Sequence, residues 1–472
     1  MRSSPEILSA YRMTKDLAAP RTLFEKLWDT HKIKTLEDGD DLLAIDRVFL
    51  HERTGAATLN ALSRSQRAPI DPSRVYCIID HIVSNKEDRG ANDARSPNGD
   101  VFIRAVREAA SEFGLNLVDT DDASQGITHV IAPELGLVLP GLSVVCPDSH
   151  TCSLGALGAL AWGIGSTAAE HAIATGTLRI KKPKQMRVKV NGKLRAPATA
   201  KDLALHLIAA YGAAGGQRCA IEFCGSAIDE LSVEERLTLC NMGVEFSAFT
   251  CVIAPSESVL EYMSTRAKSP PPELIEQAMG DWRGLFSDAS AVFDIELTIN
   301  ADDVRPMVTW GTSPEDGTHA NGTTDTSAYM GVEAGQKLSD IPIDGAFIGS
   351  CTNGRISDLR AAAAYLVGKR VADGVRAICV PGSQSVKAQA ELEGLDEIFK
   401  GAGFEWGAAG CAFCFYAGGD TFPAGSRVIS STNRNFEGRQ GPNVRTHLAS
   451  PATVAASAVA GRIIDICEVE SV

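Results

Sequence analysis

Short apolar, β-branched runs alternate along this chain with longer alanine-rich runs that have helical spacing. The short runs include 144–146, 186–190 and 346–348, and the long runs are 155–178, 201–212, 356–367 and 451–464. Strands that alternate with helices predict βαβ units, and therefore parallel sheets buried between helices. In such folds ligand groups lie in turns beyond the carboxyl ends of the strands. The residues that follow the predicted strands are therefore the first candidates for a functional site.

The chain is too long for one ordinary core. Its 472 residues predict two to four domains. A first break is suggested by the Lys-Lys-Pro-Lys stretch at 181–184, directly after an Ala/Gly-rich run, and a second by the polar stretch at 301–325. No internal period of solenoid length is present, so the expected units are separate α/β domains.

Charge and cysteine usage exclude several classes of protein. The net charge of −14 argues against a nucleic-acid partner, because only a local basic patch could offset phosphate repulsion. No apolar run is long enough for a membrane helix, and the first twenty residues lack the apolar core of a secretory signal. An organellar transit peptide stays open as an alternative to a cytoplasmic protein. The 12 cysteines are therefore interpreted as thiols and ligands rather than as a disulfide framework.

Three cysteines have the pattern of metal ligands. Cys351 lies in a Ser-Cys-Thr-Asn stretch after a predicted strand, and Cys411 and Cys414 form a C-x-x-C. Thiolates are the usual ligands of iron–sulfur clusters, and four of them saturate a cubane. A site with three would leave one iron open, and an open metal position permits Lewis-acid chemistry. The alternative for the C-x-x-C pair is a zinc site or a dithiol redox site.

Two short Asp-His stretches also follow predicted strands. They are Asp80-His81 after 75–79 and Asp148-Ser149-His150 after 142–145. A carboxylate beside an imidazole can orient and tune the ring for proton transfer. Hydroxyls and amides at a helix start favour an anionic ligand. The ordinary alternatives are a salt-bridged surface dipeptide for the first stretch and a helix N-cap for the second.

Five further residues are candidates with equally ordinary alternatives. His129 lies in an apolar segment, where a core histidine is the simpler interpretation. Asn241 and Glu245 are four residues apart and share one face if their segment is helical, but such a face is often only solvated. Arg434 and Arg439 could bind substrate carboxylates with their guanidinium forks, or could form an exposed basic loop. In combination, these groups are what metal-assisted hydration of a polycarboxylate requires.

Several long strings carry a family resemblance. They are 23–28, Leu50-His51-Glu52, Asp80-His81, 148–151, 349–353, Gly410-Cys411 with Cys414, and 431–441. With these strings in this order, the chain resembles the large subunits of bacterial-type 3-isopropylmalate dehydratases (isopropylmalate isomerases) in the aconitase superfamily, from about Thr22 to Ile466. The resemblance implies three α/β domains with mainly parallel sheets around a central iron–sulfur cluster. The implied division is an N-terminal extension at 1–21 and domains at 22–181, 182–300 and 301–472, the last with the ligand cysteines.

The resemblance also implies roles for the candidate residues. One [4Fe–4S] cluster would be held by Cys351, Cys411 and Cys414, with one iron not ligated by protein. The implied positions for acid–base chemistry and water handling are Asp80, His81, His129, Asp148, His150 and Glu245. The implied contacts to substrate are His51, Ser149, Arg434 and Arg439, and Asn241 and Asn433 would lie beside the cluster.

The implied reaction is the isomerisation of 2-isopropylmalate to 3-isopropylmalate through isopropylmaleate, a step of leucine biosynthesis. The implied partner is a small subunit with the swivel domain, because in the family that domain carries the base that removes the carbon-bound proton. The chain departs from the family in two aromatic residues at 415–416 and in Cys152-Ser153-Leu154. Homoaconitase, or a dehydratase for a methyl-, dimethyl- or benzyl-malate, is therefore an alternative. A cluster-free relative that binds RNA is an alternative from another class, which the acidic charge disfavours.

Overall fold

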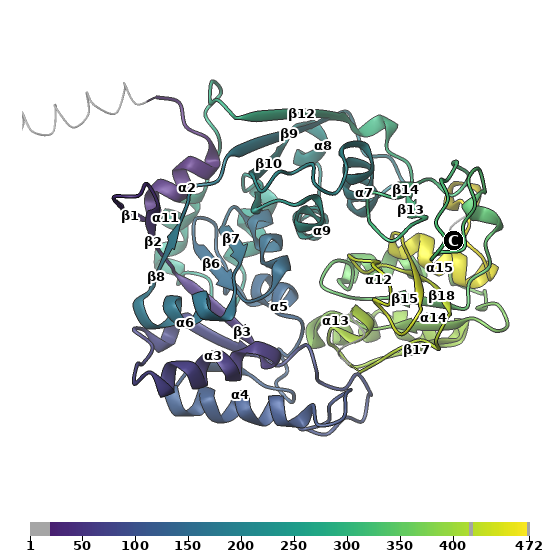
Figure 1. The fold of residues 1–472 in the computed structure, drawn as a ribbon, viewed down its shortest axis with the longest axis horizontal. Helices are drawn as coiled ribbons and strands as arrows, with labels where there is room; N and C mark the ends of the chain where they lie inside the picture. Colours follow the sequence, from purple (N-terminus) through teal and green to yellow (C-terminus); the bar gives the residue numbers. More distant parts are fainter. Residues whose placement is uncertain (1–18, 415–418, 470–472) are drawn as a thin grey trace, which may run out of the picture.

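The computed structural model describes residues 19–414 and 419–469 and shows a mixed α/β fold with several mainly parallel sheets (Figure 1). This confirms the predicted fold class. The predicted extension up to residue 18 and the aromatic pair at 415–416 lie outside the described residues. Three larger sheets each draw their strands from one of the three predicted segments. The domain boundaries themselves stay a prediction.

The first larger sheet is entirely parallel and has the strand order β5-β4-β3-β6-β7. Its strands are β3 (Arg47–His51), β4 (Val75–Ile78), β5 (Asn116–Val118), β6 (Ser143–Cys146) and β7 (Leu160–Gly163). Its helices are α3 (Glu52–Arg64), α4 (Asp100–Phe113), α5 (Thr128–Leu135), α6 (Ser166–Thr175) and the 3₁₀ segments η2 (Pro72–Arg74) and η3 (Ser149–Leu157). The chain winds outward from β3 in both directions, so the strand order reverses between β3 and β6. In this topology ligands bind beyond the carboxyl ends at that switch point.

The second larger sheet is also parallel, with the order β11-β10-β9-β12. Its strands are β9 (Gln185–Asn191), β10 (Ala220–Cys224), β11 (Thr250–Val252) and β12 (Ile295–Asn300). Its helices are α7 (Ala200–Tyr211), α8 (Ser226–Asp229), α9 (Val233–Met242), α10 (Glu257–Ser264) and α11 (Pro272–Trp282), with η4 (Gly243–Phe246) and η5 (Ala301–Asp303). Strands β9 and β12 lie along the upper edge of the molecule in Figure 1.

The third larger sheet repeats the topology of the first. Its order is β17-β16-β15-β18-β19, all parallel, with a switch point between β15 and β18. Its strands are β15 (Gly345–Ile348), β16 (Arg376–Cys379), β17 (Phe404–Trp406), β18 (Arg427–Ser430) and β19 (Arg445–Leu448). Its helices are α12 (Ile356–Ala363), α13 (Gln384–Leu392), α14 (Leu395–Ala402), α15 (Pro451–Ala460), η6 (Leu338–Asp340), η7 (Ala412–Cys414) and η9 (Ile466–Glu468). This unit forms the right-hand part of Figure 1.

Smaller elements complete the described fold. Helix α2 (Leu23–His31) precedes an antiparallel sheet of β1 (Lys32–Thr35), β2 (Asp41–Ala44) and β8 (Thr177–Ile180), and β13 (Val308–Thr309) pairs with β14 (Gly317–Thr318). None of the described helices is both long and apolar enough to cross a membrane.

The expectation of one alanine-rich helix over 155–178 was wrong. That segment contains the end of η3, strand β7 and helix α6 before β8 begins. The apolar run 160–162 pairs with β6 instead of continuing a helix. Gly158 ends η3 with a positive φ of 79°, and a Cβ at Gly163 would lie 2.6 Å from the carbonyl oxygen of Asp148. The glycines therefore break the helical pattern and let β7 approach the start of η3 closely.

Among several clusters of buried apolar side chains, one large cluster joins the first two larger sheets and another lies under the third. The first core joins Ile131 of α5 to Met186 of β9 and Phe223 of β10. The second contains Ile348 of β15 and Phe399 of α14. The first and second units therefore share part of their core. The functional residues lie where these units meet the third.

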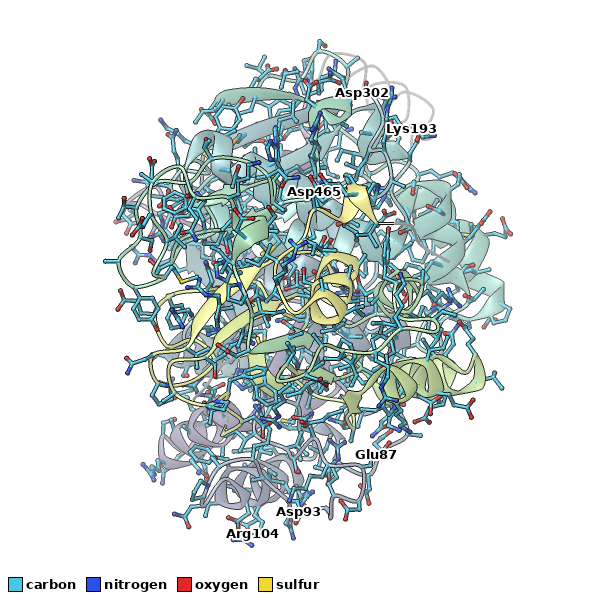
Figure 2. The ribbon with its side chains drawn as sticks, turned by 90° about the vertical axis from the view of Figure 1, so that its right-hand side faces the viewer. Glu87, Asp93, Arg104, Lys193, Asp302 and Asp465 are labelled. Atoms are coloured by element: carbon cyan, nitrogen blue, oxygen red, sulfur yellow. The ribbon has the colours of Figure 1, made fainter. Side chains whose placement is uncertain are left out.

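Charged side chains cover the outer surface. Lys193 and Asp302 project from the upper part of the face in Figure 2, and Glu87 and Arg104 project from its lower part. Lys193 lies 3.3 Å from Glu230 with both side chains more than half exposed. Such exposed pairs contribute little to stability. The buried polar groups described next are in a different situation.

Candidate functional site

A cavity of about 300 Å³ lies where the carboxyl ends of the first and third larger sheets meet. The first sheet contributes His51 at the end of β3, His81 after β4 and the 148–150 stretch after β6. The third sheet contributes Cys351 after β15, and Cys411 and Cys414 after β17, together with two arginines after β18. Both switch points therefore open into the same cavity.

A larger cavity of about 690 Å³ lies beside it, between residues 84–100 and the β16–β17 edge. Arg376, one of its lining residues, is already paired with Glu405 at 2.7 Å, and Arg95 is paired with Asp420 at 3.1 Å. None of the predicted site residues lines it. The smaller cavity is therefore the better candidate for a reaction site, although it is not the largest.

Asp148 lies at the centre of the cavity wall that the first larger sheet provides, which is called the first wall; the third larger sheet provides the second wall. It caps η3 by accepting a hydrogen bond from the His150 backbone at 2.7 Å, and its other oxygen lies 3.2 Å from His81 Nε2. His129 Nε2 also lies 3.2 Å away, within ion-pair distance but without hydrogen-bond geometry. Burial by itself raises the pKa of Asp148, but the three imidazoles together hold that pKa well below its usual range. The carboxylate therefore stays ionised.

Asp80 holds the other side of the His81 ring. Its Oδ1 lies 2.5 Å from His81 Nδ1, and its Oδ2 accepts hydrogen bonds from the backbone and hydroxyl of Thr128 at 2.8 and 2.9 Å. Burial lowers the pKa of His81, but the charge of Asp80 and the contact with Asp148 raise it well above its usual value. The two carboxylates on either side of the ring thus favour the protonated form of His81.

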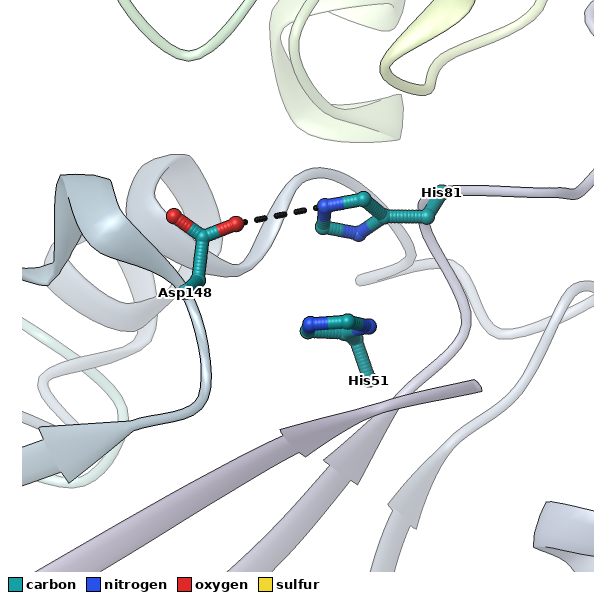
Figure 3. A group of neighbouring side chains, drawn as sticks. All are labelled: His51, His81 and Asp148. Atoms are coloured by element: carbon teal, nitrogen blue, oxygen red, sulfur yellow. Dashed lines mark ion pairs between the residues drawn. The ribbon is translucent and has the colours of Figure 1, made fainter. Parts of the chain in front are cut away.

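His51 lies against His81 in the opposite protonation state. The two rings stack with centroids 4.1 Å apart, and a carboxylate oxygen of Asp148 lies at the Nε2 edge of the His81 ring (Figure 3). Burial, followed by the charge of His81, lowers the pKa of His51 to about 4. His51 Nε2 lies 3.2 Å from the carbonyl oxygen of Pro147, to which it can donate a hydrogen bond. Neighbouring groups whose pKa values are pushed apart are typical of acid–base sites.

Glu245 links the first wall to an arginine of the second. It lies in η4, a 3₁₀ turn that begins directly after α9 ends at Met242, so Asn241 and Glu245 do not lie on one continuous α-helix. Its carboxylate accepts a hydrogen bond from His150 Nε2 at 2.9 Å and lies 2.7 Å from Arg434 Nε. Burial raises the pKa of Glu245, but His150 and Arg434 lower it overall. Burial, and to a smaller extent the charge of Arg434, lowers the pKa of His150, but the contacts with Asp148 and Glu245 raise it overall.

The three predicted ligand cysteines lie in apolar surroundings on the second wall. Cys351, Cys411 and Cys414 form a buried cluster with Ile127 and Val130. Burial raises the pKa of Cys351 to about 12 and that of Cys411 well above its usual value. Burial also raises that of Cys414, but the charge of Arg439 and a hydrogen bond from Ser350 bring its pKa below the ordinary value. Two of the thiols therefore need an attached cation to ionise.

Polar donors point at these sulfurs. The side-chain amides of Asn241 and Asn433 lie 3.2 and 3.5 Å from the sulfur of Cys351. The hydroxyl of Ser350 lies 3.5 Å, and a guanidinium nitrogen of Arg439 3.6 Å, from the sulfur of Cys414. Hydrogen bonds to sulfur are a known means of tuning iron–sulfur clusters. Soft thiolates with N–H and O–H donors around them fit such a cluster.

A single metal ion fits the three thiols less well. Among the described residues, ligand atoms lie within 4.8 Å of one another in His51, His81 and Asp148, and in Asp80, His81 and Cys411, but the three cysteines do not form such a group. A zinc ion needs all its sulfurs about 2.3 Å from one centre. A cluster spreads its thiolates over several irons and so accepts a wider spacing. Because Cys411 itself belongs to one of these groups, the zinc alternative for the C-x-x-C pair stays open.

The structure brings every predicted site residue to this place. Those that line the cavity are His51, His81, His129, Asp148, Ser149, His150, Cys351, Cys411, Cys414, Arg434 and Arg439. The other four each contact one of these: Asp80, Asn241, Glu245 and Asn433. Their roles in catalysis stay predictions, but their proximity is a property of the fold.

Some residues of the site were missed in the sequence. Arg53 and Thr54, in the first turn of α3, also line the cavity. Glu52 is fully buried and accepts hydrogen bonds from the backbones of Asp80, at 3.1 Å, and Ile82. An acidic residue directly after a buried strand, in Leu50-His51-Glu52, was the available signal. Glu52 fixes the turn that presents His81.

Comparison with protein-family profiles matches residues 25–461 to the aconitase family (aconitate hydratase). Among solved structures, the aconitase X of Thermococcus kodakaraensis in its holo form is similar to this chain at 14% sequence identity. The similarity covers 92% of this chain and 94% of that chain, with a TM-score of 0.46. A likeness at that level supports no inference about activity.

Proposed function

The chain belongs to the aconitase family, a family of hydro-lyases, and from that premise we propose that it is the large subunit of a 3-isopropylmalate dehydratase. The proposed reaction converts 2-isopropylmalate to 3-isopropylmalate by dehydration and rehydration through isopropylmaleate. One observation carries the proposal. A single cavity combines an imidazole held between two carboxylates, two arginines and three thiols of the cluster-ligand pattern.

His81 is the residue suited to hand a proton to the departing hydroxyl. It lines the cavity, and Asp80 and Asp148 keep its ring protonated from opposite sides. His150, whose pKa is raised by its contacts with Asp148 and Glu245, is a second group on the same wall suited to donate a proton. General acids placed in this way contribute on the order of 10²- to 10⁴-fold to a rate.

Arg434 and Arg439 are suited to hold the substrate carboxylates. Both line the cavity, and Glu245 fixes the direction of the Arg434 guanidinium through contacts at 2.7 and 3.0 Å. Bidentate guanidinium–carboxylate pairs give orientation as well as affinity. Ser149, at the start of η3, adds a hydroxyl on the opposite wall.

Members of the aconitase family generally bind a [4Fe–4S] cluster, and Cys351, Cys411 and Cys414 would hold it here. When bound, it would supply a Lewis-acidic iron that makes a hydroxyl a better leaving group. The described donors of the chain would keep it in place: Asn241 and Asn433 at Cys351, and Ser350 at Cys414. Three α/β domains at 22–181, 182–300 and 301–472 around this centre remain part of the proposal.

We further propose that the chain works with a small swivel-domain subunit. The resemblance of the chain to isopropylmalate isomerases implies that the base for the carbon-bound proton lies on that partner. The experiment is to purify the chain alone and with a co-expressed small subunit under anaerobic conditions, and to follow isopropylmaleate by its ultraviolet absorbance. Activity only in the pair supports the proposal. Robust turnover by the chain alone contradicts the heteromer.

One observation favours a second candidate, a homoaconitase-type dehydratase. Arg53 adds a third guanidinium to the residues that line the cavity, and among them only Ile127 and Pro147 are apolar apart from the cysteines. A third substrate carboxylate would suit Arg53 better than an isopropyl group would. A panel of 2-substituted malates and of tricarboxylates, assayed with the assembled pair, separates the two candidates by the ratio of kcat/KM.

A further inference from the structure

Lys201 is a buried cation that neither the sequence patterns nor the proposed chemistry accounts for. It lies in the first turn of α7, and none of its surface is exposed. Its ammonium group makes hydrogen bonds to three neutral oxygens rather than to a carboxylate. These are the side-chain oxygen of Asn353 at 3.3 Å and the backbone carbonyls of Ser431, at 2.9 Å, and Thr432.

This position is unfavourable for a lysine on local grounds. A cation in the first turn of a helix opposes the helix dipole, and burying a charge is costly unless it is fully hydrogen-bonded. Burial lowers the pKa of Lys201 to about 7. An apolar side chain of similar length would fill the space at lower cost. Residues that break a local rule in this way are expected where they serve a site.

The three acceptors belong to two loops that both lead into the cavity. Asn353 lies two residues after Cys351, in the loop that follows β15. Ser431 and Thr432 directly precede Asn433 and Arg434, in the loop that follows β18. One ammonium group therefore contacts both loops at the switch point of the third larger sheet. It reaches them from the second larger sheet, to which α7 belongs.

We propose that Lys201 is a positioning residue that sets the placement of Cys351 relative to the Asn433-Arg434 pair. The importance of that placement for cluster retention and substrate binding rests on the proposed function. The hydroxyl of Ser431 also contacts the backbone of Gly349, at 3.1 Å from its nitrogen. The side-chain amide of Asn433 also donates to the hydroxyl of Thr352 at 2.9 Å. Without Lys201 these direct contacts between the loops would remain, but the two carbonyls would be left buried without their donor.

Asp202, the next residue, provides a matched control. It is also fully buried, but its carboxylate accepts hydrogen bonds from the backbones of Thr199 at 2.8 Å and Met307 at 2.7 Å. These contacts cap α7 and hold the segment that leads into the third unit. They do not reach either loop of the switch point. Loss of Asp202 should therefore weaken the same helix without moving the site.

The test compares K201M, D202N and the exposed-lysine variant K193M in the iron-free chain and in the reconstituted pair. In the iron-free chain, alkylation rates are measured by mass spectrometry for Cys351 and for Cys379, a buried thiol of β16 away from the cavity. After reconstitution, iron and sulfide content, loss of visible absorbance in air, kcat and KM are measured. Melting temperatures report the stability of each variant.

We expect K201M to raise the Cys351 rate relative to the Cys379 rate, to speed loss of the cluster about tenfold and to raise KM. We expect D202N to lower the melting temperature with the thiol ratio and cluster lifetime unchanged, and K193M to resemble the wild type. Equal thiol ratios in K201M and wild type, or the same change in D202N, overturn the inference. If K201M does not fold, K201R is used instead, because arginine keeps the hydrogen-bond donors. The ratio of the Cys351 to the Cys379 alkylation rate in that variant is then compared with the wild-type ratio. A wild-type chain that takes up no iron contradicts the proposed function, while the iron-free thiol ratio still tests Lys201.

Discussion

The first and third larger sheets have the same strand order, but their switch points carry different chemistry. Between β3 and β6 lie imidazoles and carboxylates that satisfy one another, as Asp148 and His81 do at 3.2 Å. Between β15 and β18 the chain presents arginines and a thiol, with the C-x-x-C pair next to them in apolar surroundings. One topology thus provides two walls of unlike character.

The two walls differ in what their side chains need in order to ionise. The acid–base wall reaches its charge states through contacts within the chain, which lower the pKa of Asp148 and raise that of His81. The thiol wall has two sulfurs whose pKa values burial raises, so their ionised forms depend on a bound metal. We therefore expect substitutions in the two walls to fail in distinguishable ways.

The largest expected effect is on the thiol wall. C351S should remove a ligand of the proposed cluster. Iron content and turnover should therefore both fall by more than about hundredfold, which exceeds the effect of changing a residue that only hydrogen-bonds to a ligand. Iron and sulfide analysis with an activity assay of the assembled pair measures this. C467S, at an exposed thiol, is the control. Full iron content in C351S would show that Cys351 is not a cluster ligand, and the contrast between the two walls would then fail.

D148N tests the acid–base wall. The neutral amide no longer stabilises the protonated His81, so kcat should fall on the order of 10²- to 10⁴-fold. Iron content should stay at the wild-type level, because Asp148 lies on the other wall. D119N, which loosens a partly exposed pair with Arg107, is the matched control. A loss of iron in D148N would show that the walls are not separable.

R434K should have a smaller effect, mainly on substrate binding. Lysine keeps the charge but cannot form the bidentate fork, so KM should rise about tenfold or more. Steady-state kinetics on the assembled pair measures the change. R376K, which alters an arginine paired with Glu405 outside the site, should leave KM unchanged. A wild-type KM for R434K would remove Arg434 from the substrate contacts.

The smallest expected effect is a pH dependence of stability. The raised pKa of His81 means that its stabilisation is complete below the unfolded value of 6.5 and is lost as the pH rises through the folded value. The lowered pKa of Asp148 gives a contribution present above 3.8 and lost as the pH falls through its folded value. Urea titrations of the iron-free wild type and D148N should therefore differ most between these limits, and the difference should shrink at higher pH. A difference that does not vary with pH would contradict the pairing.

Much of the site was predictable because its residues follow strands. Asp80-His81, Asp148 and Cys351 each come directly after a strand that the apolar pattern reveals, and parallel strands end at one edge of a sheet. His129 and Glu245 had simpler local interpretations, as a core histidine and a solvated helix face. Their contacts with Asp148 and with His150 join residues far apart in the chain, which no local pattern records.

The alternation of strands and helices, the three thiols and the Asp-His stretches were properties of the sequence alone, since each depends on neighbours within a few residues. The break in the 155–178 segment, the charge states of His51 and His81, and the reach of Lys201 to two loops came only from the tertiary structure. They depend on how separate sheets pack, because a buried group's pKa and partners are set by residues that the fold brings to it.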